Sequence, residues 1–229
     1  MRDQGHTGEP ASPLRPAHVE FAGGQVEPDL FFRQILSRGQ SRLKQPETPM
    51  EVYVVKVTLL GTSPPVWRRI LVPRDISLRN LHRTLQTVMG WTNSHLHQFV
   101  CRKARLSDPR SRVGSTVADE NRTKLGDLIG TVGARLLYEY DFGDGWQHEL
   151  LLEEVLLGDE TFQQMCVAGK RCSPPEDCGG PQGFAELIQA LQDPNHPSHD
   201  EACEWLGDFV PESFSVDDVN RRLRRHRNH

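Results

Sequence analysis

The sequence lacks the features that place a protein in or across a membrane. Its 229 residues contain no run of about 18 apolar residues, the length that a membrane-spanning helix needs. The first residues, Met1 to Glu9, also lack the apolar core of a secretory signal. We therefore expect a cytoplasmic protein without a membrane partner.

An excess of positive charge is also lacking. The net charge is −4 and charged residues make up 25% of the chain, so neither a strongly basic nucleic-acid binder nor an acidic disordered chain is indicated. A nucleic-acid or protein partner would have to contact a local patch. The best basic patch has arginine at five of the positions 221 to 227, and its candidate binding residues are Arg221, Arg224 and Arg225.

Familiar functional motifs are missing as well. We find no helix-turn-helix, P-loop, dinucleotide-binding glycine motif or Ser-His-Asp order, and no C-x-x-C pair. The chain has five cysteines, an odd number without an export signal. They are therefore interpreted as reduced thiols or metal ligands rather than as a disulfide framework.

The sequence divides into a short extension and one domain. Residues 1–49 are rich in Gly, Pro, Gln and charge, and are predicted to be flexible with a possible short helix at 29–37. From Glu51 the pattern changes to regular apolar alternation, and 50–226 is long enough for a single core.

Periodicity in this domain predicts an α+β fold with a mostly antiparallel sheet. Alternating apolar residues indicate strands, and apolar residues at helical spacing indicate helices. Residues 102–122 are predicted to be a polar loop. The expected elements are hairpins at 51–72 and 136–155, a strand at 95–101, and helices at 78–89, 183–192 and 216–226.

The apolar pattern of the second hairpin predicts its register. A three-residue loop, 143–145, would pair Tyr140 with His148 and place the apolar residues of both strands on one face. His148 is then expected on the packed side, and Asp144 is expected to project at the tip.

Three cysteines repeat at equal spacing in a segment dense in Gly and Pro. Cys166, Cys172 and Cys178 could supply thiolates to a structural zinc ion, completed by His148 or Cys203. Alternatively, they are ordinary buried thiols. Zinc is therefore a possible cofactor.

Two histidines and several acidic residues are candidates for chemistry. His95 and His97 stand two apart, so a strand would point both imidazoles the same way. If the hairpin tip meets the cysteine segment, they could join a cation site or an acid/base site. The candidate catalytic residues are His95, His97, Asp141, Asp144 and His148.

Five segments of the chain resemble the plasmid pRiA4b ORF-3-like family. They are YVVKVTLLGTSPPVWRRILVP, GWTNSHLHQF, YEYDFGDGWQHELLLE, CVAGKRCSPPEDCGGPQGFAELIQAL and WLGDFVPESFSVDDVNRRL. The resemblance implies an α+β fold in proteins carried by plasmids and mobile elements, without an established activity. The chain departs from the family pattern at Ser173, where the family commonly has the cysteine that precedes the two prolines.

These observations leave two hypotheses open. In the first, the chain is a non-enzymatic binding or accessory domain that presents its hairpin tip and cysteine segment as one recognition surface. In the second, it is a metal-dependent hydrolase or nuclease that uses the histidine and aspartate candidates. The candidate binding residues of the first hypothesis, besides the arginines, are Trp91, Tyr140, Trp146, Glu176 and Asp177.

Overall fold

The computed structural model describes residues 49–101, 104–107, 117–159 and 161–226. Contacts between residues divide the chain into two units, Met1–Gln40 and Ser41–His229, and every described residue belongs to the second. The helix predicted at 29–37 lies outside the described residues. No described helix has the length and apolar character that crossing a membrane requires.

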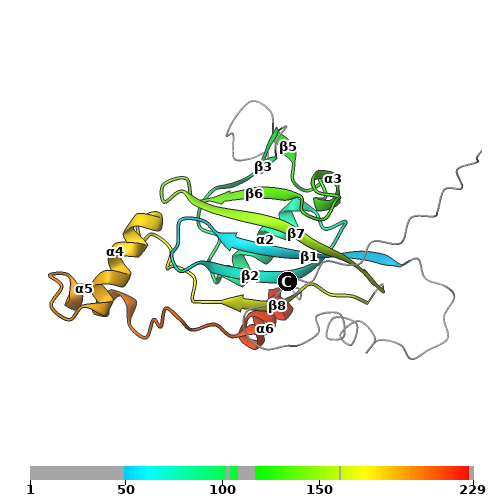
Figure 1. The fold of residues 1–229 in the computed structure, drawn as a ribbon. Helices are drawn as coiled ribbons and strands as arrows, with labels where there is room; N and C mark the ends of the chain where they lie inside the picture. Colours follow the sequence, from blue (N-terminus) through cyan, green and yellow to red (C-terminus); the bar gives the residue numbers. More distant parts are fainter. Residues whose placement is uncertain (1–48, 102–103, 108–116, 160, 227–229) are drawn as a thin grey trace, which may run out of the picture. The chain divides into compact units, whose positions relative to one another are not determined.

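One mixed sheet forms the centre of the described unit (Figure 1). Its strand order is β5-β4-β3-β6-β7-β1-β2-β8, and every neighbouring pair is antiparallel except β4 and β5. Both predicted hairpins are present, as β1–β2 and β6–β7. The strands are β1 (Met50–Leu59), β2 (Val66–Pro73), β3 (His97–Cys101), β4 (Ala104–Ser107), β5 (Val117–Asp119), β6 (Arg135–Tyr140), β7 (Trp146–Gly158) and β8 (Met165–Lys170).

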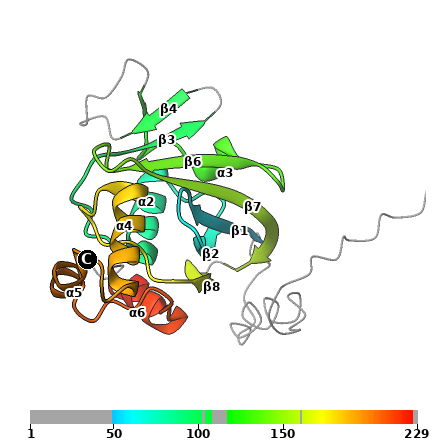
Figure 2. The same cartoon turned by 60° about the vertical axis from the view of Figure 1, so that its left-hand side comes forward.

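Helices accompany the sheet, which confirms the α+β class. Helix α2 lies across one face, and α6 packs against both α2 and β8 (Figures 1 and 2). Ser77 caps α2 by accepting a hydrogen bond from the Asn80 backbone at 3.3 Å, and Gly90 ends it with a φ of 79°. The helices are α2 (Leu78–Met89), α3 (Leu125–Leu128), α4 (Gly180–Gln192), α5 (His199–Leu206) and α6 (Val216–His226).

The two faces of the sheet differ in polarity. Alternate residues of β1, such as Val55 and Val57, are fully buried in the apolar core that includes α2. The opposite face carries an ion pair between Arg69 and Glu153 at 2.5 Å. Full burial of each aliphatic side chain contributes about 1.5 to 3 kcal/mol, so the α2 face holds the domain together.

The register of the β6–β7 hairpin differs from the prediction. Tyr138, not Tyr140, pairs with His148, and the connecting loop spans 141–145. The Asp141 side chain accepts hydrogen bonds from the backbone of Gly143 at 3.0 Å and Asp144 at 3.3 Å, and this local turn takes up two more residues than predicted. Because the shift is two residues, the same side chains remain on the buried face.

Two further predictions were wrong about loops. The segment 102–122 was predicted to be a polar loop, but it supplies β4 and the edge strand β5. The cysteine segment begins with β8, so Cys166 lies in a strand. These strands have three to six residues, too few for alternation to stand out from a loop.

Candidate cation site at the hairpin tip

The tip of the β6–β7 hairpin lies against the segment that follows the cysteines. A side-chain Cβ at Gly180 would be 2.2 Å from the carbonyl oxygen of Asp144, and Gly180 has a φ of 69°. Only glycine fits this close approach. The contact brings the tip beside residues 174–178, which we call the PPEDC loop, as the site hypothesis requires.

Three candidate side chains meet at this contact. His95 Nδ1 lies 3.6 Å from Asp141 Oδ2, and His95 Nε2 lies 3.2 Å from Asp177 Oδ1. One ligand atom from each residue can be chosen so that all three lie within 4.8 Å of one another. Within the described ranges, no other set of His, Cys, Asp and Glu meets that condition. We call these three residues the His95 cluster.

Local structure orients the members of the His95 cluster. Asp141 Oδ1 is used by its own turn, which leaves Oδ2 facing His95. His95 Nε2 is buried and, although Asp177 is 3.2 Å away, it makes no aligned hydrogen bond. The Asp177 side chain is 73% exposed. The cluster therefore has one buried carboxylate, one half-buried imidazole and one carboxylate open to solvent.

Glu176 anchors the PPEDC loop beside the cluster. Its Oε1 accepts a hydrogen bond from the Tyr140 hydroxyl at 2.6 Å, and its Oε2 accepts from the Thr92 backbone at 2.8 Å. Burial opposes ionisation of Glu176, but the hydrogen bonds from Thr92 and Tyr140 hold its pKa below the usual value. Burial and the bond to Glu176 raise the pKa of Tyr140, which stays a proton donor. Glu176 thus positions the loop as a charged acceptor.

His97 does not join His95, which corrects the prediction that both point the same way. Strand β3 begins at His97, so His95 lies before the strand and outside its alternation. His97 Nε2 lies 2.9 Å from Glu120, and its ring stacks on His82 at 3.5 Å. His82 also bonds the Tyr138 hydroxyl at 2.8 Å. His97 therefore belongs to a buried polar network.

His148 and Asp144 also lie outside the His95 cluster. His148 is fully buried, and neither ring nitrogen has a hydrogen-bond partner among the described residues. Burial lowers the pKa of His148 to about 3, although the nearby Tyr138 backbone opposes part of that shift. Asp144 does not project freely, because its Oδ2 is buried. The polar residues predicted around the tip thus separate into different environments.

The cysteines do not converge, which corrects the predicted zinc site of Cys166, Cys172, Cys178 and His148. The thiol of Cys166 donates to the Ala168 carbonyl at 3.3 Å within β8. Burial raises the pKa of Cys166 to about 11 and that of Cys172, and burial together with Asp144 raises that of Cys178 to about 12. Among the described residues, none of Cys166, Cys172, Cys178 and His148 belongs to a group of His, Cys, Asp and Glu whose ligand atoms lie close enough to hold one metal ion.

The aromatic binding candidates are core residues. Trp91, Tyr140 and Trp146 are 8%, 1% and 1% exposed, and the Trp91 ring stacks on Tyr140 at 5.1 Å. They pack beneath the hairpin and can stiffen it, but they offer no exposed ring on which a ligand could stack. The arginine candidates Arg221, Arg224 and Arg225 are exposed on α6.

Comparison with known proteins places this fold and site in a family. Residues 51–218 match the family described as plasmid pRiA4b ORF-3-like protein. The chain belongs to the plasmid pRiA4b ORF-3-like family. An uncharacterised protein, y4hQ of Sinorhizobium fredii, is 42% identical over 172 residues, which are 74% of this chain and 89% of the relative.

A solved structure of similar fold agrees. The protein of unknown function MM3350 from Methanosarcina mazei Go1 has a TM-score of 0.68 and 38% sequence identity, over 75% of this chain and 99% of the other. Membership of the plasmid pRiA4b ORF-3-like family thus assigns the fold, while these relatives carry names without an activity. The chemistry of the site has to be argued from its residues.

Sequence reasoning missed three polar residues that shape this pRiA4b ORF-3-like domain. Thr92 donates a hydrogen bond to Glu176, Glu120 forms a hydrogen bond with His97, and Arg68 is buried in β2. For Arg68 a signal was available, because it takes an inward position in the alternating run Val66, Arg68, Ile70. Thr92 and Glu120 contact residues distant in sequence, and no local pattern predicts such pairs.

Proposed function

We propose that this plasmid-associated domain is a binding or accessory module that holds one divalent metal ion at the His95 cluster. The supporting observation is the approach of one imidazole and two carboxylates from three separate segments to within 4.8 Å. Imidazole and carboxylate together suit zinc and other divalent transition metals.

The spacing of the cluster is close to that of a coordination sphere. Ligands bound at about 2.0 to 2.2 Å in a tetrahedron lie about 3.3 Å from one another. The contacts of His95 with Asp177 and Asp141, at 3.2 and 3.6 Å, are of similar length, but they start from different ring nitrogens, Nε2 and Nδ1. Only one imidazole nitrogen would bind the metal, so the ring and the exposed Asp177 side chain would need to rotate.

The backbone of both carboxylate residues is also unusual. Asp141 has a φ of 56° and Asp177 a φ of 61°, in the left-handed region that side chains other than Gly, Asn and Asp rarely adopt. Such conformations cluster at functional sites because surrounding structure must hold them. Here the Asx turn and the anchoring of Glu176 do so, and they place both carboxylates beside His95.

The test is metal titration of the full chain by calorimetry, using Zn²⁺ and Mn²⁺ separately. One equivalent is expected to bind wild type, and His95→Gln or Asp177→Asn is expected to weaken binding at least about tenfold, or 1.4 kcal/mol. Asp208→Asn is the matched control, since Asp208 is exposed and outside the cluster. Binding below one equivalent, or equal binding by Asp177→Asn, would contradict the proposal.

Metal-dependent hydrolysis is a second candidate function. Three protein ligands leave a coordination position for water, the arrangement of catalytic rather than structural zinc sites. The 73% exposure of Asp177 would keep that position accessible. Hydrolysis of bis-p-nitrophenyl phosphate by metal-loaded wild type, and its loss in Asp177→Asn with the fold intact, would favour the enzyme. Stoichiometric metal binding without turnover would instead support the binding module proposed above.

Contact with nucleic acid is supported only by helix α6. Arg221, Arg224 and Arg225 are exposed there, and arginine binds phosphate well. Two acidic residues in the first turn, Asp217 and Asp218, reduce the local positive charge. Phosphate contact through α6 is therefore a weaker proposal than metal binding at the hairpin tip, and a protein partner at α6 would use the same exposed arginines.

A further inference from the structure

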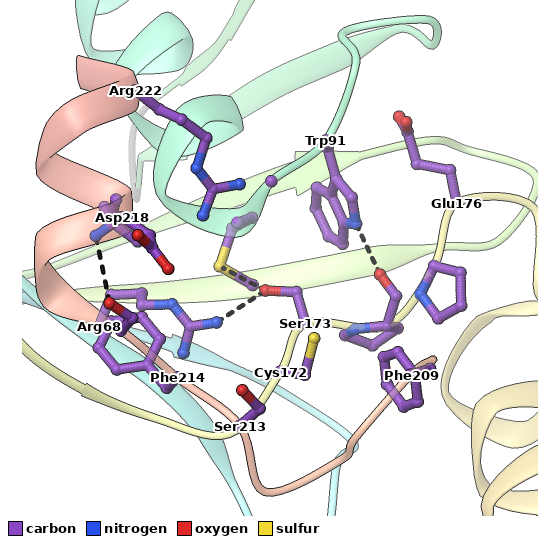
Figure 3. Close-up of a pocket in the computed structure, with 16 residues that line it drawn as sticks. Arg68, Trp91, Cys172, Ser173, Glu176, Phe209, Ser213, Phe214, Asp218 and Arg222 are labelled. Carbon is purple, nitrogen blue, oxygen red and sulfur yellow. Dashed lines mark hydrogen bonds between the residues drawn. The ribbon is translucent and has the colours of Figure 1, made fainter. Parts of the chain in front are cut away.

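A cavity of about 320 Å³ lies on the other side of the PPEDC loop (Figure 3). Its walls come from β2, the end of α2, the segment 172–176, the segment before α6, and α6 itself. Trp91, Phe209 and Phe214 give it an aromatic lining. Its volume is at the small end of ligand pockets, so an occupant would be a small molecule.

Arg68 supplies a buried positive charge to this cavity. It is 2% exposed, and the Phe214 ring lies 4.2 Å from its guanidinium carbon. Nε donates to Val88 O at 3.0 Å, and Nη1 donates to Trp67 O at 2.8 Å and Lys170 O at 3.0 Å. These three acceptors are neutral carbonyls, so they orient the guanidinium without neutralising it.

The remaining donors of Arg68 point to the cavity side. Nη2 donates to Ser173 Oγ at 2.9 Å. A guanidinium has five N–H groups, so four hydrogen bonds leave one N–H of Nη2 without an acceptor among the described residues. No carboxylate pairs with Arg68 in this part of the chain. Arg171, equally buried, differs in having Glu212 at 2.9 Å.

A second arginine faces the same space. Figure 3 shows the guanidinium of Arg222 directed from α6 toward the cavity. Neither a hydrogen bond nor an ion pair joins it to a described residue. Its charge repels that of Arg68 and, after burial, helps lower the pKa of Arg68 to about 10, at which Arg68 is still protonated near neutral pH. An anion between the two guanidinium groups would relieve this repulsion.

The other ionisable groups that line the cavity do not neutralise the arginines. Asp218 lies 2.9 Å from Arg221, and Glu176 accepts from Tyr140 and Thr92. Burial raises the pKa of the Cys172 thiol against the opposing effect of Arg68, so it stays neutral. Arg68 and Arg222 therefore have no carboxylate partner of their own among the described residues, although the charged Glu176 also lines the cavity.

We propose that the cavity binds a small organic anion, with its charged head between Arg68, Arg222 and Ser173 and a flat apolar body against Trp91 and Phe214. The head is a carboxylate or a phosphate, since arginine binds both through paired hydrogen bonds. This site shares no residue with the His95 cluster and does not depend on the metal-binding proposal.

The experiment measures binding of benzoate and phenyl phosphate to the full chain by NMR or calorimetry, at constant ionic strength. Probe concentrations reach about 10 mM, because molecules of this size bind in the millimolar range. Saturable binding of at least one anion is expected, with benzamide and inorganic phosphate at least about tenfold weaker. Which anion binds more tightly distinguishes a carboxylate head from a phosphate head.

Variants locate the binding. Arg222→Gln removes one guanidinium from an exposed position and is expected to weaken binding about tenfold, whereas Arg225→Gln on the same helix leaves it unchanged. Ser213→Phe, at an exposed lining position, fills the cavity and is expected to block binding without touching either arginine. Equal effects of the two arginine variants, unchanged binding by Ser213→Phe, equal binding of benzamide, or no binding of either anion would each overturn the proposal.

Discussion

The His95 cluster and the cavity lined by Arg68 lie on either side of the PPEDC loop. They differ in charge, in burial and in the elements that supply their residues. The cluster is acidic and open, and its carboxylates come from turns. The cavity contains two arginines and is partly open, and its central charge comes from an inward position of a β-strand. The Asp141 and Asp177 charges can be removed without opening the core, whereas the Arg68 charge cannot. The His95 cluster thus contains side chains that can adjust to a ligand, whereas the charge of Arg68 is held in place by the core.

The largest loss of stability is expected when Arg68 is replaced. Arg68→Met keeps much of the side-chain volume but leaves the Val88, Trp67 and Lys170 carbonyls and Ser173 Oγ, all buried or partly buried, without this donor. We expect the free energy of unfolding to fall by about 3 kcal/mol, because each buried polar group that is left without its partner costs about 1 kcal/mol or more. Urea denaturation followed by tryptophan fluorescence measures the change.

Asp177→Asn provides the counterpart in the His95 cluster. Its side chain is 73% exposed, so the free energy of unfolding is expected to change by less than about 0.5 kcal/mol. If Arg68→Met were as stable as Asp177→Asn, Arg68 would not be part of the structural core and the contrast between the two regions would fail.

The same contrast explains how much the sequence could reveal. The apolar alternation of β1 and the capped α2 are set by local physics, and both elements are predictable from sequence. His95, Asp141 and Asp177 are also recognisable as candidates, since ionisable side chains in turn segments rich in Gly and Pro are easily noticed in the sequence. Their assembly rests on the Gly180 contact with Asp144, which joins residues far apart in sequence. No local pattern contains such a contact.

The failures share one physical reason. Trp91 was a candidate binding residue and His148 a candidate metal ligand, yet both lie in the core, where Trp91 contacts His148 edge-on at 5.2 Å. Composition does not distinguish a buried polar ring from an exposed one, because burial depends on partners elsewhere in the chain. Arg68 was overlooked although its inward position in the alternating run Val66, Arg68, Ile70 could be read from the sequence.

The pH dependence of stability tests how the buried His148 differs from the half-buried His95. The folded state lowers the pKa of His148 from 6.5 to about 3, so the unfolded chain binds more protons between these values. The contribution of neutral His148 is therefore complete above pH 6.5 and is lost as the pH falls toward 3. Wild type is expected to lose about 1.4 kcal/mol per pH unit more than His148→Leu below about pH 6.

Urea unfolding of both proteins at several pH values between about 6.5 and about 5 measures this slope. Over that range the difference in the free energy of unfolding should change by about 2 kcal/mol. His196→Leu, at a half-exposed position in the turn before α5, is the control and should follow wild type. Parallel pH profiles of wild type and His148→Leu would show that His148 is not buried as a neutral ring.

Ligand-dependent stability can show whether the two regions act separately. Zn²⁺ at about ten times its Kd is expected to raise the free energy of unfolding of wild type by about 1.4 kcal/mol. Arg222→Gln should keep this increase, and Asp177→Asn should reduce it to about 0.4 kcal/mol or less while keeping the response to benzoate. An effect of Zn²⁺ that vanishes in Arg222→Gln would show that the PPEDC loop couples the sites.

Only a small change in stability is expected on the outer face of α6. Arg221 pairs with Asp218 at 2.9 Å, but both side chains are more than half exposed, and Arg224 and Arg225 are exposed as well. Replacing all three arginines with Gln should change the free energy of unfolding by less than about 1 kcal/mol. Any retention on DNA at low salt should then weaken, with the slope of log K against log salt reduced by about one for each phosphate that the variant no longer neutralises. Retention equal to that of wild type would remove α6 as a phosphate-binding surface.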